Sequence, residues 1–314
     1  MPTPDHHLSH EDALHHDWDP NRDPALTVEP GEVVRFDCLD ASGGRLSPGT
    51  GVEELRNAEF QGHPLTGPVA IEGAEPGDGL VVELLAVETG DWGVTYTYPG
   101  EEGGSGLLPD TAPEGRVHHW DLTRDDGVAE FRGCEIPLAP FPGNLGLTPA
   151  DGPASTVPPR NVGGNLDVRH LVTGSRLHLP VEVAGGLFSI GDGHAAQGDG
   201  EVCITAIECP TTVDVRFEVT EEAPESPWFE SPGTEAAWRE GPAICTTGVG
   251  PDLHAGSKDA LRGMLDRLEE RGFDRPDAYL LCSVACDLQV SQVVNAPNWT
   301  VTARLPKRVL PSTQ

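Results

Sequence analysis

The chain has 314 residues and a formal net charge of −31, because 51 Asp and Glu residues stand against only 20 Lys and Arg. A surface of this charge repels the phosphates of nucleic acids, so no nucleic-acid partner is expected. The length allows one large or two ordinary domains, and no apolar run approaches the length of a membrane span, so no membrane association is expected.

The acidic residues are spread among apolar, strand-like segments, which indicates a folded protein with an acidic surface. Lys258 and Lys307 are the only lysines. Dispersed acid with so little lysine is similar to cytoplasmic proteins of salt-adapted microbes, so we expect a halophilic setting. Copies of such a chain repel one another unless salt screens the charge or the contact uses patches with fewer acids.

Seven cysteines are scattered through the chain without a Cys-X-X-Cys pair. This pattern favours reduced thiols. The first twenty residues have no apolar core and no basic start, so they are not expected to form a signal peptide. We therefore expect a cytoplasmic protein.

The N-terminal segment contains a group of histidines that suits either a metal-binding arm or a solvated, mobile terminus. We leave this group out of the candidate site. Its members are His6, His7, His10, His15 and His16.

A sequence pattern in which Glu-Pro-Gly-Asp/Glu stands between two strand-like runs occurs twice, over Val28–Phe36 and Ile71–Leu84. A Pro-Gly turn favours a tight reversal, so both copies are predicted to be hairpins. Residues 90–126, rich in Gly, Trp and Tyr, are predicted to be a long loop that ends in a strand near His118–Leu122. Residues 140–167 are predicted to be a long irregular segment, which compact proteins rarely keep without a purpose.

The stretch Ile190–Val202 is the most informative feature, because it places carboxylates and a histidine on glycine-rich backbone between two strand-like runs. Asp192 and His194 are two residues apart, as are Asp199 and Glu201, so each pair shares a face if the backbone is extended. Such a loop suits a divalent metal, or a water held between an acid and a base. The alternative is an acidic hairpin loop without a function.

Helical periodicity predicts a helix over Ser257–Arg271, capped by Ser257 and ended by Gly272. A second helix is predicted over Pro276–Cys286, followed by strands at 288–294 and 300–305. The sequence thus predicts a mainly β protein with a β-rich body over residues 1–220 and a smaller C-terminal α+β portion over residues 221–314, packed into the same unit.

Six segments in order across nearly the whole chain resemble the acetamidase/formamidase family. They are PALTVEPGEVVRFDCLD (24–40), HPLTGPVAIEGAEPGDGLVVELL (63–85), GLLPD (106–110), PRNVGGNLDVRHL (159–171), LFSIGDGHAAQGDGEVCITAIE (187–208) and DAYLLCSVACDLQVSQVVNAPNWTVTARLPKRVL (277–310). The resemblance implies β-sandwich and β-barrel layers with a mixed α/β portion. It also implies hydrolysis of formamide or acetamide to the acid and ammonia, a divalent zinc or calcium ion, and a homo-oligomer, which we take to be a dimer.

Amide hydrolysis needs an activated water, stabilisation of the oxyanion and a proton for the leaving nitrogen. Glu201 is the candidate general base or acid, and Asn165 is placed to orient the amide or the oxyanion. Arg160 and His63 are candidate substrate-binding residues. The candidate metal ligands are Asp167, Asp192, His194 and Asp199.

Two other functions stay open at this point. A non-catalytic β-sandwich module would use the Asp192–Glu201 loop to bind a metal or a carbohydrate, although aromatic residues make up only 5% of the chain. A paralogous enzyme would hydrolyse a different amide or a related carbon–nitrogen bond.

Overall fold

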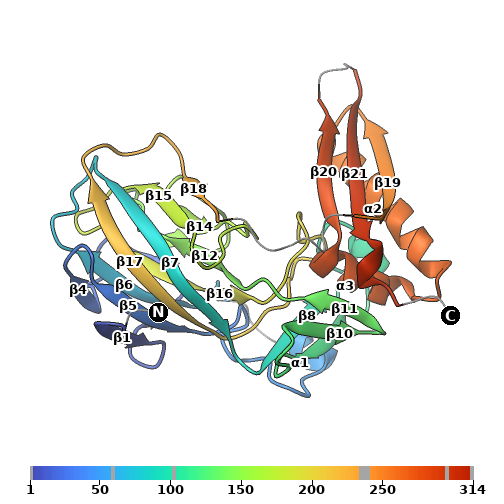
Figure 1. The fold of residues 1–314 in the computed structure, drawn as a ribbon, viewed down its shortest axis with the longest axis horizontal. Coiled ribbons are helices and arrows are strands. Elements are labelled where there is room, and N and C mark those ends of the chain that lie inside the picture. The colour runs from blue at the N-terminus through green and yellow to red at the C-terminus, as the bar shows by residue number, and fades with distance from the viewer. Residues whose placement is uncertain (1–2, 58–60, 101–103, 233–240, 294–296, 312–314) are drawn as a thin grey trace.

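The computed structural model describes residues 3–57, 61–100, 104–232, 241–293 and 297–311 (Figure 1). Two six-stranded sheets form the larger part of the molecule. The first has the order β1 (His6–Ser9), β5 (Val33–Cys38), β17 (Thr211–Thr220), β7 (Gly79–Thr89), β15 (Arg176–Pro180) and β18 (Trp228–Glu230). The second has the order β14 (Gly163–Asn165), β12 (Phe141–Gly146), β16 (Phe188–His194), β6 (Leu65–Ile71) and β2 (Leu14–His15), and β4 (Leu26–Val28) also pairs with β6.

The two sheets pack face to face over one apolar core. Phe188 of the second sheet lies edge-on to Phe36 and Phe217 of the first, with ring centroids 5.7 and 5.0 Å apart. These three rings are almost completely buried. Burying such aromatic side chains is among the largest apolar contributions that one residue makes to folding. The mainly β, sandwich-like fold expected from the sequence is therefore confirmed.

A second apolar core lies under the C-terminal sheet, which stands to the right in Figure 1. Its sheet has the order β19 (Ala243–Gly250), β21 (Trp299–Pro306) and β20 (Asp287–Gln292), covered by α2 (Leu253–Glu269) and α3 (Arg275–Ala285). The same core takes in side chains from residues 108–136 and 195–209. The division of the chain at residue 220 stays a prediction.

Short elements complete the described chain. They are β3 (Asp17–Trp18) with β13 (Ala154–Ser155), β8 (Trp92–Thr97) with β9 (Arg116–Asp121), β10 (Val128–Phe131) with β11 (Cys134–Pro137), helix α1 (Val52–Asn57), and the 3₁₀ turns η1 (Pro109–Thr111) and η2 (Lys307–Val309).

The two Glu-Pro-Gly-Asp/Glu turns are not hairpins, contrary to the prediction. Each leads from the second sheet to the first, from β4 to β5 and from β6 to β7. In both turns the proline is followed by a glycine with positive φ, Gly31 or Gly77. The N–H of the fourth turn residue, Glu32 or Asp78, donates to the carbonyl of the first. The carboxylate of this fourth residue accepts a hydrogen bond from the N–H of the first residue. The repeat therefore encodes two equivalent turns between the sheets.

Two segments predicted to be long and irregular contain strands. Residues 90–126 contain the antiparallel pair β8 and β9, and residues 140–167 contain β12, β13 and β14. The buried strand β12 reads Phe-Pro-Gly-Asn-Leu-Gly, a composition that resembles a turn. It is a strand because β14 and β16 pair with its two edges.

The glycine-rich stretch at 190–202 is also different from the predicted loop. Its first half belongs to strand β16, in which the glycines permit close packing rather than turning. A Cβ on Gly191 would lie 2.2 Å from the carbonyl oxygen of Pro64, and one on Gly193 would lie 2.3 Å from the side chain of Thr211. The strand-like run after it, Val202–Glu208, is buried except for Ile204, and it is irregular apart from an isolated bridge at Glu208.

Both C-terminal helices are present, with shifted starts. Helix α2 begins at Leu253, because the Asp252 side chain accepts from the N–H of His254, and Ser257 lies inside the helix rather than at its cap. Helix α3 begins at Arg275, with Asp274 as its cap. Among the described residues, no helix is long and apolar enough to cross a membrane.

The N-terminal histidines are part of the folded structure. His15 is only 6% exposed, and its Nδ1 and Nε2 lie 2.7 Å from the carbonyl oxygen of Asp17 and 2.9 Å from the hydroxyl of Ser189. A neutral ring donates through Nδ1 to the carbonyl and accepts through Nε2 from the hydroxyl. Burial lowers the pKa of His15 from 6.5 to about 4.

This burial predicts a pH-dependent stability. Because the folded pKa lies below the unfolded value, the contribution of neutral His15 is complete above pH 6.5 and is lost as the pH falls toward 4. Between pH 7.5 and pH 5, the wild-type free energy of unfolding should fall by about 2 kcal/mol more than that of His15→Asn. Denaturant titrations at the two pH values measure this difference. The control is His7→Asn, which changes an exposed ring. Equal pH dependence of the wild type and His15→Asn would contradict the prediction.

Candidate active site

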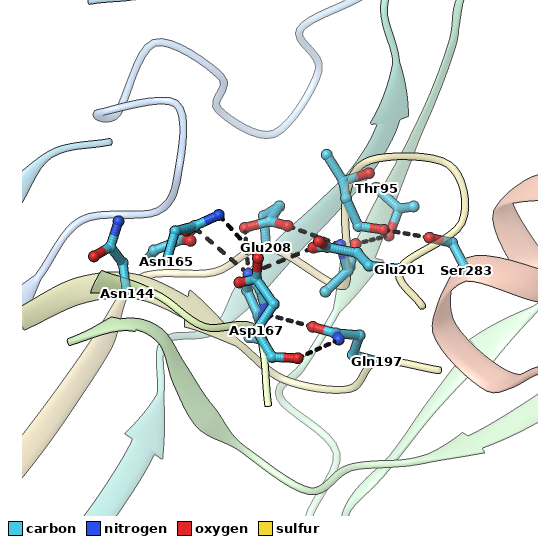
Figure 2. A network of polar contacts seen from close by, with 12 residues as sticks. Thr95, Asn144, Asn165, Asp167, Gln197, Glu201, Glu208 and Ser283 are labelled. Atoms are coloured by element: carbon cyan, nitrogen blue, oxygen red, sulfur yellow. Dashed lines mark hydrogen bonds and ion pairs between the residues drawn. The ribbon is translucent and has the colours of Figure 1, made fainter. Parts of the chain in front are cut away.

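A cavity of about 360 Å³ gathers most of the candidate residues. Its floor is polar and its outer part is apolar and aromatic (Figure 2 shows part of the polar network). It is lined by Ala41, His63, Tyr96, Tyr98, Val157, Asn165, Asp167, Asp192, His194, Glu201, Ile204, Thr205 and Glu208.

Three segments of the chain bring the ionisable residues together. Strand β16 carries Asp192 and His194, which share the cavity face as their spacing predicts. Asp167 follows strand β14, which pairs with β12, the neighbour of β16. Glu201 and Glu208 come from the irregular segment after β16.

The backbone at the cavity is unusual. Among the described residues, six non-glycine residues have a positive φ, and four of them line the cavity: Asp167, Asp192, Glu201 and Ile204. Positive φ costs energy for residues with a Cβ, especially β-branched ones. Strained backbone of this kind is maintained by the surrounding structure and is concentrated at functional sites.

His194 is the centre of the polar floor. Its Nε2 lies 3.2 Å from Glu208 Oε2, 3.5 Å from Asp192 Oδ1 and 3.9 Å from Glu201 Oε1. The ring itself is 1% exposed and rests edge-on against Phe141. One buried imidazole nitrogen thus lies close to three carboxylates.

Gln197 fixes the orientation of this imidazole. Its amide nitrogen donates to the main-chain oxygen of Asp167 at 2.8 Å, so its amide oxygen is the atom that faces His194 Nδ1, 2.9 Å away. An amide oxygen only accepts, so Nδ1 carries the hydrogen. In the neutral ring, Nε2 then presents its lone pair to the carboxylates.

Burial raises the pKa of three carboxyl groups in the cavity. It raises the pKa of Asp167 to about 6 and that of Glu208 to about 7. Burial also raises the pKa of Glu201 well above its ordinary value, and the neighbouring negative charge of Asp167 adds to this. Glu201 therefore keeps its proton to a higher pH than an ordinary glutamic acid does.

Asp192 and His194 behave in the opposite way. Burial disfavours the charge on Asp192, but electrostatic attraction to the neighbouring imidazoles of His63 and His194 outweighs it and holds the pKa of Asp192 below its ordinary value. Burial likewise lowers the pKa of His194, yet the carboxylates of Glu208 and Asp192 raise it well above 6.5. Groups with such divergent proton affinities in one pocket are typical of acid–base sites.

The other candidate residues divide into two groups. Asn165 and His63 line the cavity, and the Asn165 amide donates to Asp167 Oδ2 at 2.9 Å, which leaves its buried oxygen without a hydrogen-bond partner. Asp199 is not among the lining residues, because its carboxylate forms a two-pronged pair with Arg169 at 2.7 and 2.9 Å. Arg160 is also outside the lining and donates to the carbonyl of Pro158.

Sequence reasoning missed Glu208 and Gln197. Glu208 is a single carboxylate in an otherwise uncharged run, Val202–Cys209, and it is 1% exposed. That isolation is a usable signal, because a carboxylate within an apolar run is expected to be buried, and a buried carboxylate needs a partner. Gln197 gave no signal, since its role depends on contacts with Asp167 and His194.

The donor atoms fit a divalent cation. Buried oxygens of Asp167, Asp192 and Glu208 accept no hydrogen bond of normal geometry. Donor atoms of Asp192, His194 and Glu208 lie within 4.8 Å of one another, as do those of Asp167, His194 and Glu201. An imidazole with carboxylates is a ligand set for zinc, whereas calcium takes oxygen ligands.

Comparison with known proteins gives the class of protein. The model of the Acetamidase/Formamidase family matches residues 3–152 and 150–311. A formamidase from Methylophilus methylotrophus is 29% identical over 363 residues, which cover 94% of this chain and 89% of that protein. An acetamidase from Mycolicibacterium smegmatis is 29% identical over 279 residues, covering 68% of each.

Solved structures agree with this assignment. A gamma lactamase from Delftia acidovorans has a TM-score of 0.89 at 26% identity, covering 97% of this chain and 93% of that chain. An acetamidase from Bacillus halodurans has a TM-score of 0.67 at 29% identity, covering 96% and 97%. The chain belongs to the acetamidase/formamidase family, and it is a hydrolase of linear amides.

Gly143 of β12 provides a steric test of the site. A Cβ at this position would lie 2.7 Å from the His194 ring, 2.8 Å from Asp167 Oδ1 and 2.9 Å from Asp192 Oδ2. Gly143→Ala should therefore displace all three groups and lower kcat/KM for amide hydrolysis by about 100-fold. The control is Gly250→Ala, where nothing lies within 4 Å of the added atom. Equal activity of the two variants would show that the cavity is not the reaction site.

Proposed function

We propose that the cavity hydrolyses short linear amides, with formamide and acetamide as the first candidates, and that a divalent metal assists the reaction. The observation that carries the proposal is the convergence of one oriented imidazole nitrogen with buried carboxylates in a cavity of a family member. Asp192, His194 and Glu208 would hold the ion, and we propose zinc because of the imidazole. Such an ion lowers the pKa of a water and polarises a carbonyl.

The chain's own residues would supply the proton transfers. Glu201 lies 3.9 Å from His194 Nε2 at the edge of the cluster. It would take a proton from water as the new carbon–oxygen bond forms. It would then return a proton to nitrogen as the carbon–nitrogen bond breaks, which releases ammonia and the carboxylic acid. The free amide oxygen of Asn165 would accept a hydrogen bond from the substrate N–H.

A cyclic amide is a second candidate substrate. The support is the TM-score of 0.89 with the gamma lactamase, against 0.67 with the Bacillus halodurans acetamidase. We also propose a cytoplasmic location and a salt-rich setting. They are supported by the seven cysteines, six of them buried thiols, and by the net charge of −31.

Three isosteric variants test the roles together. Asp192→Asn should lose bound metal and activity, and Glu201→Gln should keep the metal but lower kcat by 10²- to 10⁴-fold. Asp199→Asn is the matched control, because its carboxylate pairs with Arg169 outside the cavity, and it should keep the metal. Metal content by mass spectrometry and ammonia release from formamide, acetamide, propionamide and urea at high salt are the measurements. Loss of metal from Asp199→Asn but not from Asp192→Asn would reverse the assignment.

We further propose that the chain forms a homo-oligomer through the outer face of the C-terminal sheet. Thr246 and Gly248 of β19 contact α2, so the alternate side chains point away from the helices. Residues 288–314 contain no Asp or Glu, and neither do residues 241–251. The outward side chains are Cys245, Thr247, Val249, Gln289, Ser291, Thr302 and Arg304.

The binding partner that this face favours is a second copy of the same chain. Two molecules of charge −31 repel each other, and a contact that buries no carboxylate avoids the largest part of that cost. The three strands also project from the rest of the molecule, where they are open to a partner (Figure 1). β19 forms an edge of the sheet without a charged side chain to block pairing.

Adding charge to this face should separate the subunits. Wild-type protein in high salt should have about twice the 33.3 kDa mass of one chain, and Thr247→Glu should move it toward the monomer. Light scattering after size exclusion measures the mass. The matched control is Thr27→Glu, which adds the same charge to an exposed position on β4. A monomeric wild type, or an unchanged mass for Thr247→Glu, would refute the proposed interface.

A further inference from the structure

The open side of the cavity is apolar, unlike its floor. Val157 and Ile204, which line it from separate segments, are 45% and 49% exposed. Tyr96, which is only 3% exposed, and the half-buried Tyr98 also line the cavity, with their rings edge-on at 5.3 Å. Apolar side chains exposed next to a polar pocket are typical of a ligand-binding surface.

Ile204 is held at this position against its backbone preference. Its φ of +91° is unfavourable for a β-branched residue. The neighbouring Thr205 fixes the segment, because its hydroxyl donates to the Tyr96 carbonyl at 2.8 Å and accepts from the Tyr96 N–H at 3.0 Å. Ser283 of α3 donates to the Thr205 carbonyl at 2.7 Å. The structure thus maintains strain that places an apolar side chain beside the cavity, partly in water.

The size of the cavity is also greater than the smallest amides need. Acetamide has four heavy atoms, and at roughly the 30 Å³ that one water occupies in the liquid, it takes about 120 Å³. The cavity measures about 360 Å³. The cavity thus has room beyond acetamide, and Val157, Ile204, Tyr96 and Tyr98 are among the residues that line it.

We propose that Val157, Ile204, Tyr96 and Tyr98 form an apolar subsite for the hydrocarbon side of the substrate. The favoured substrates are then aliphatic amides whose acyl group is larger than methyl, up to small branched or ring-closed ones. This inference rests on the proposed function, since it takes the polar floor as the place where the amide bond reacts. It adds that the wall selects the substrate by apolar contact.

The first test is a chain-length series. Over formamide, acetamide, propionamide and butyramide, kcat/KM should rise by about three- to fourfold per methylene, because each buried methylene adds apolar contact. Ile204→Gly removes the apolar group, and glycine accepts the positive φ, so the variant should fold while the butyramide-to-acetamide ratio falls about tenfold. Val290→Ser, which changes an exposed valine of β20, is the control and should leave the ratio unchanged. A flat or falling series in the wild type would overturn the subsite.

The second test separates the subsite from the reaction. In the Glu201→Gln holoenzyme, calorimetry should show butyramide binding about tenfold more tightly than acetamide, and Ile204→Gly in that background should remove the difference. If no amide releases ammonia from the wild-type holoenzyme, the proposed function fails, and this binding difference still tests the apolar wall. Equal affinities for the two amides would overturn the subsite even if both are hydrolysed.

Discussion

The main physical constraint on this structure is the free-energy cost of burying several carboxyl groups around one imidazole. Asp192, His194 and Glu208 are each at most 2% exposed, and removing such charges from water is costly. Opposite charge offsets part of this cost, and so do single hydrogen bonds, such as the one from the Ala206 N–H to Glu208 Oε1 at 2.8 Å. The remaining unsatisfied oxygens all point into the same cavity. A cation bound there would offset the cost of these buried negative charges, which is the basis of the proposed metal site.

The second apolar core gives this cluster its rigidity. The segment after β16 is tied to α3 and β20 at several points, including Gly198 N–H to the Ser283 carbonyl at 2.7 Å and Leu288 N–H to the Asp199 carbonyl at 2.9 Å. Arg169 joins the carboxylates of Asp199 and Asp287. The acidic residue that looked like a ligand in the sequence is thus part of the clamp that holds the site segment. Its carboxylate is paired with Arg169, and its backbone is bonded to β20, on the chain segment that carries Glu201 and Glu208.

The wider acidity of the chain has a different meaning from the acidity of the site. Most carboxylates are on the surface, where they interact with water and salt, and acid alone does not indicate a site. Two regions differ from the rest of the surface in their acidic residues. The cavity floor concentrates buried acids, and on the outer face of the C-terminal sheet the only acid among the described residues is Asp287, which is buried and paired with Arg169. The proposed reaction site and the proposed subunit contact therefore lie in the two places where the density of acidic residues differs from the rest of the surface.

The sequence by itself determined the family, the mainly β class, the two C-terminal helices and the pairing of Asp192 with His194. These follow from ordered motifs, periodicity and two-residue spacing, which are local properties. The sequence was misleading at Gly191 and Gly193, because glycine occurs both in turns and where backbones pack closely. These two glycines permit close packing in a buried strand and do not form a turn. Only the tertiary structure brought Glu208 and Gln197 to His194 and moved Asp199 away to Arg169. Those assignments depend on contacts between separate segments, and no local pattern encodes which side chains a folded backbone brings together.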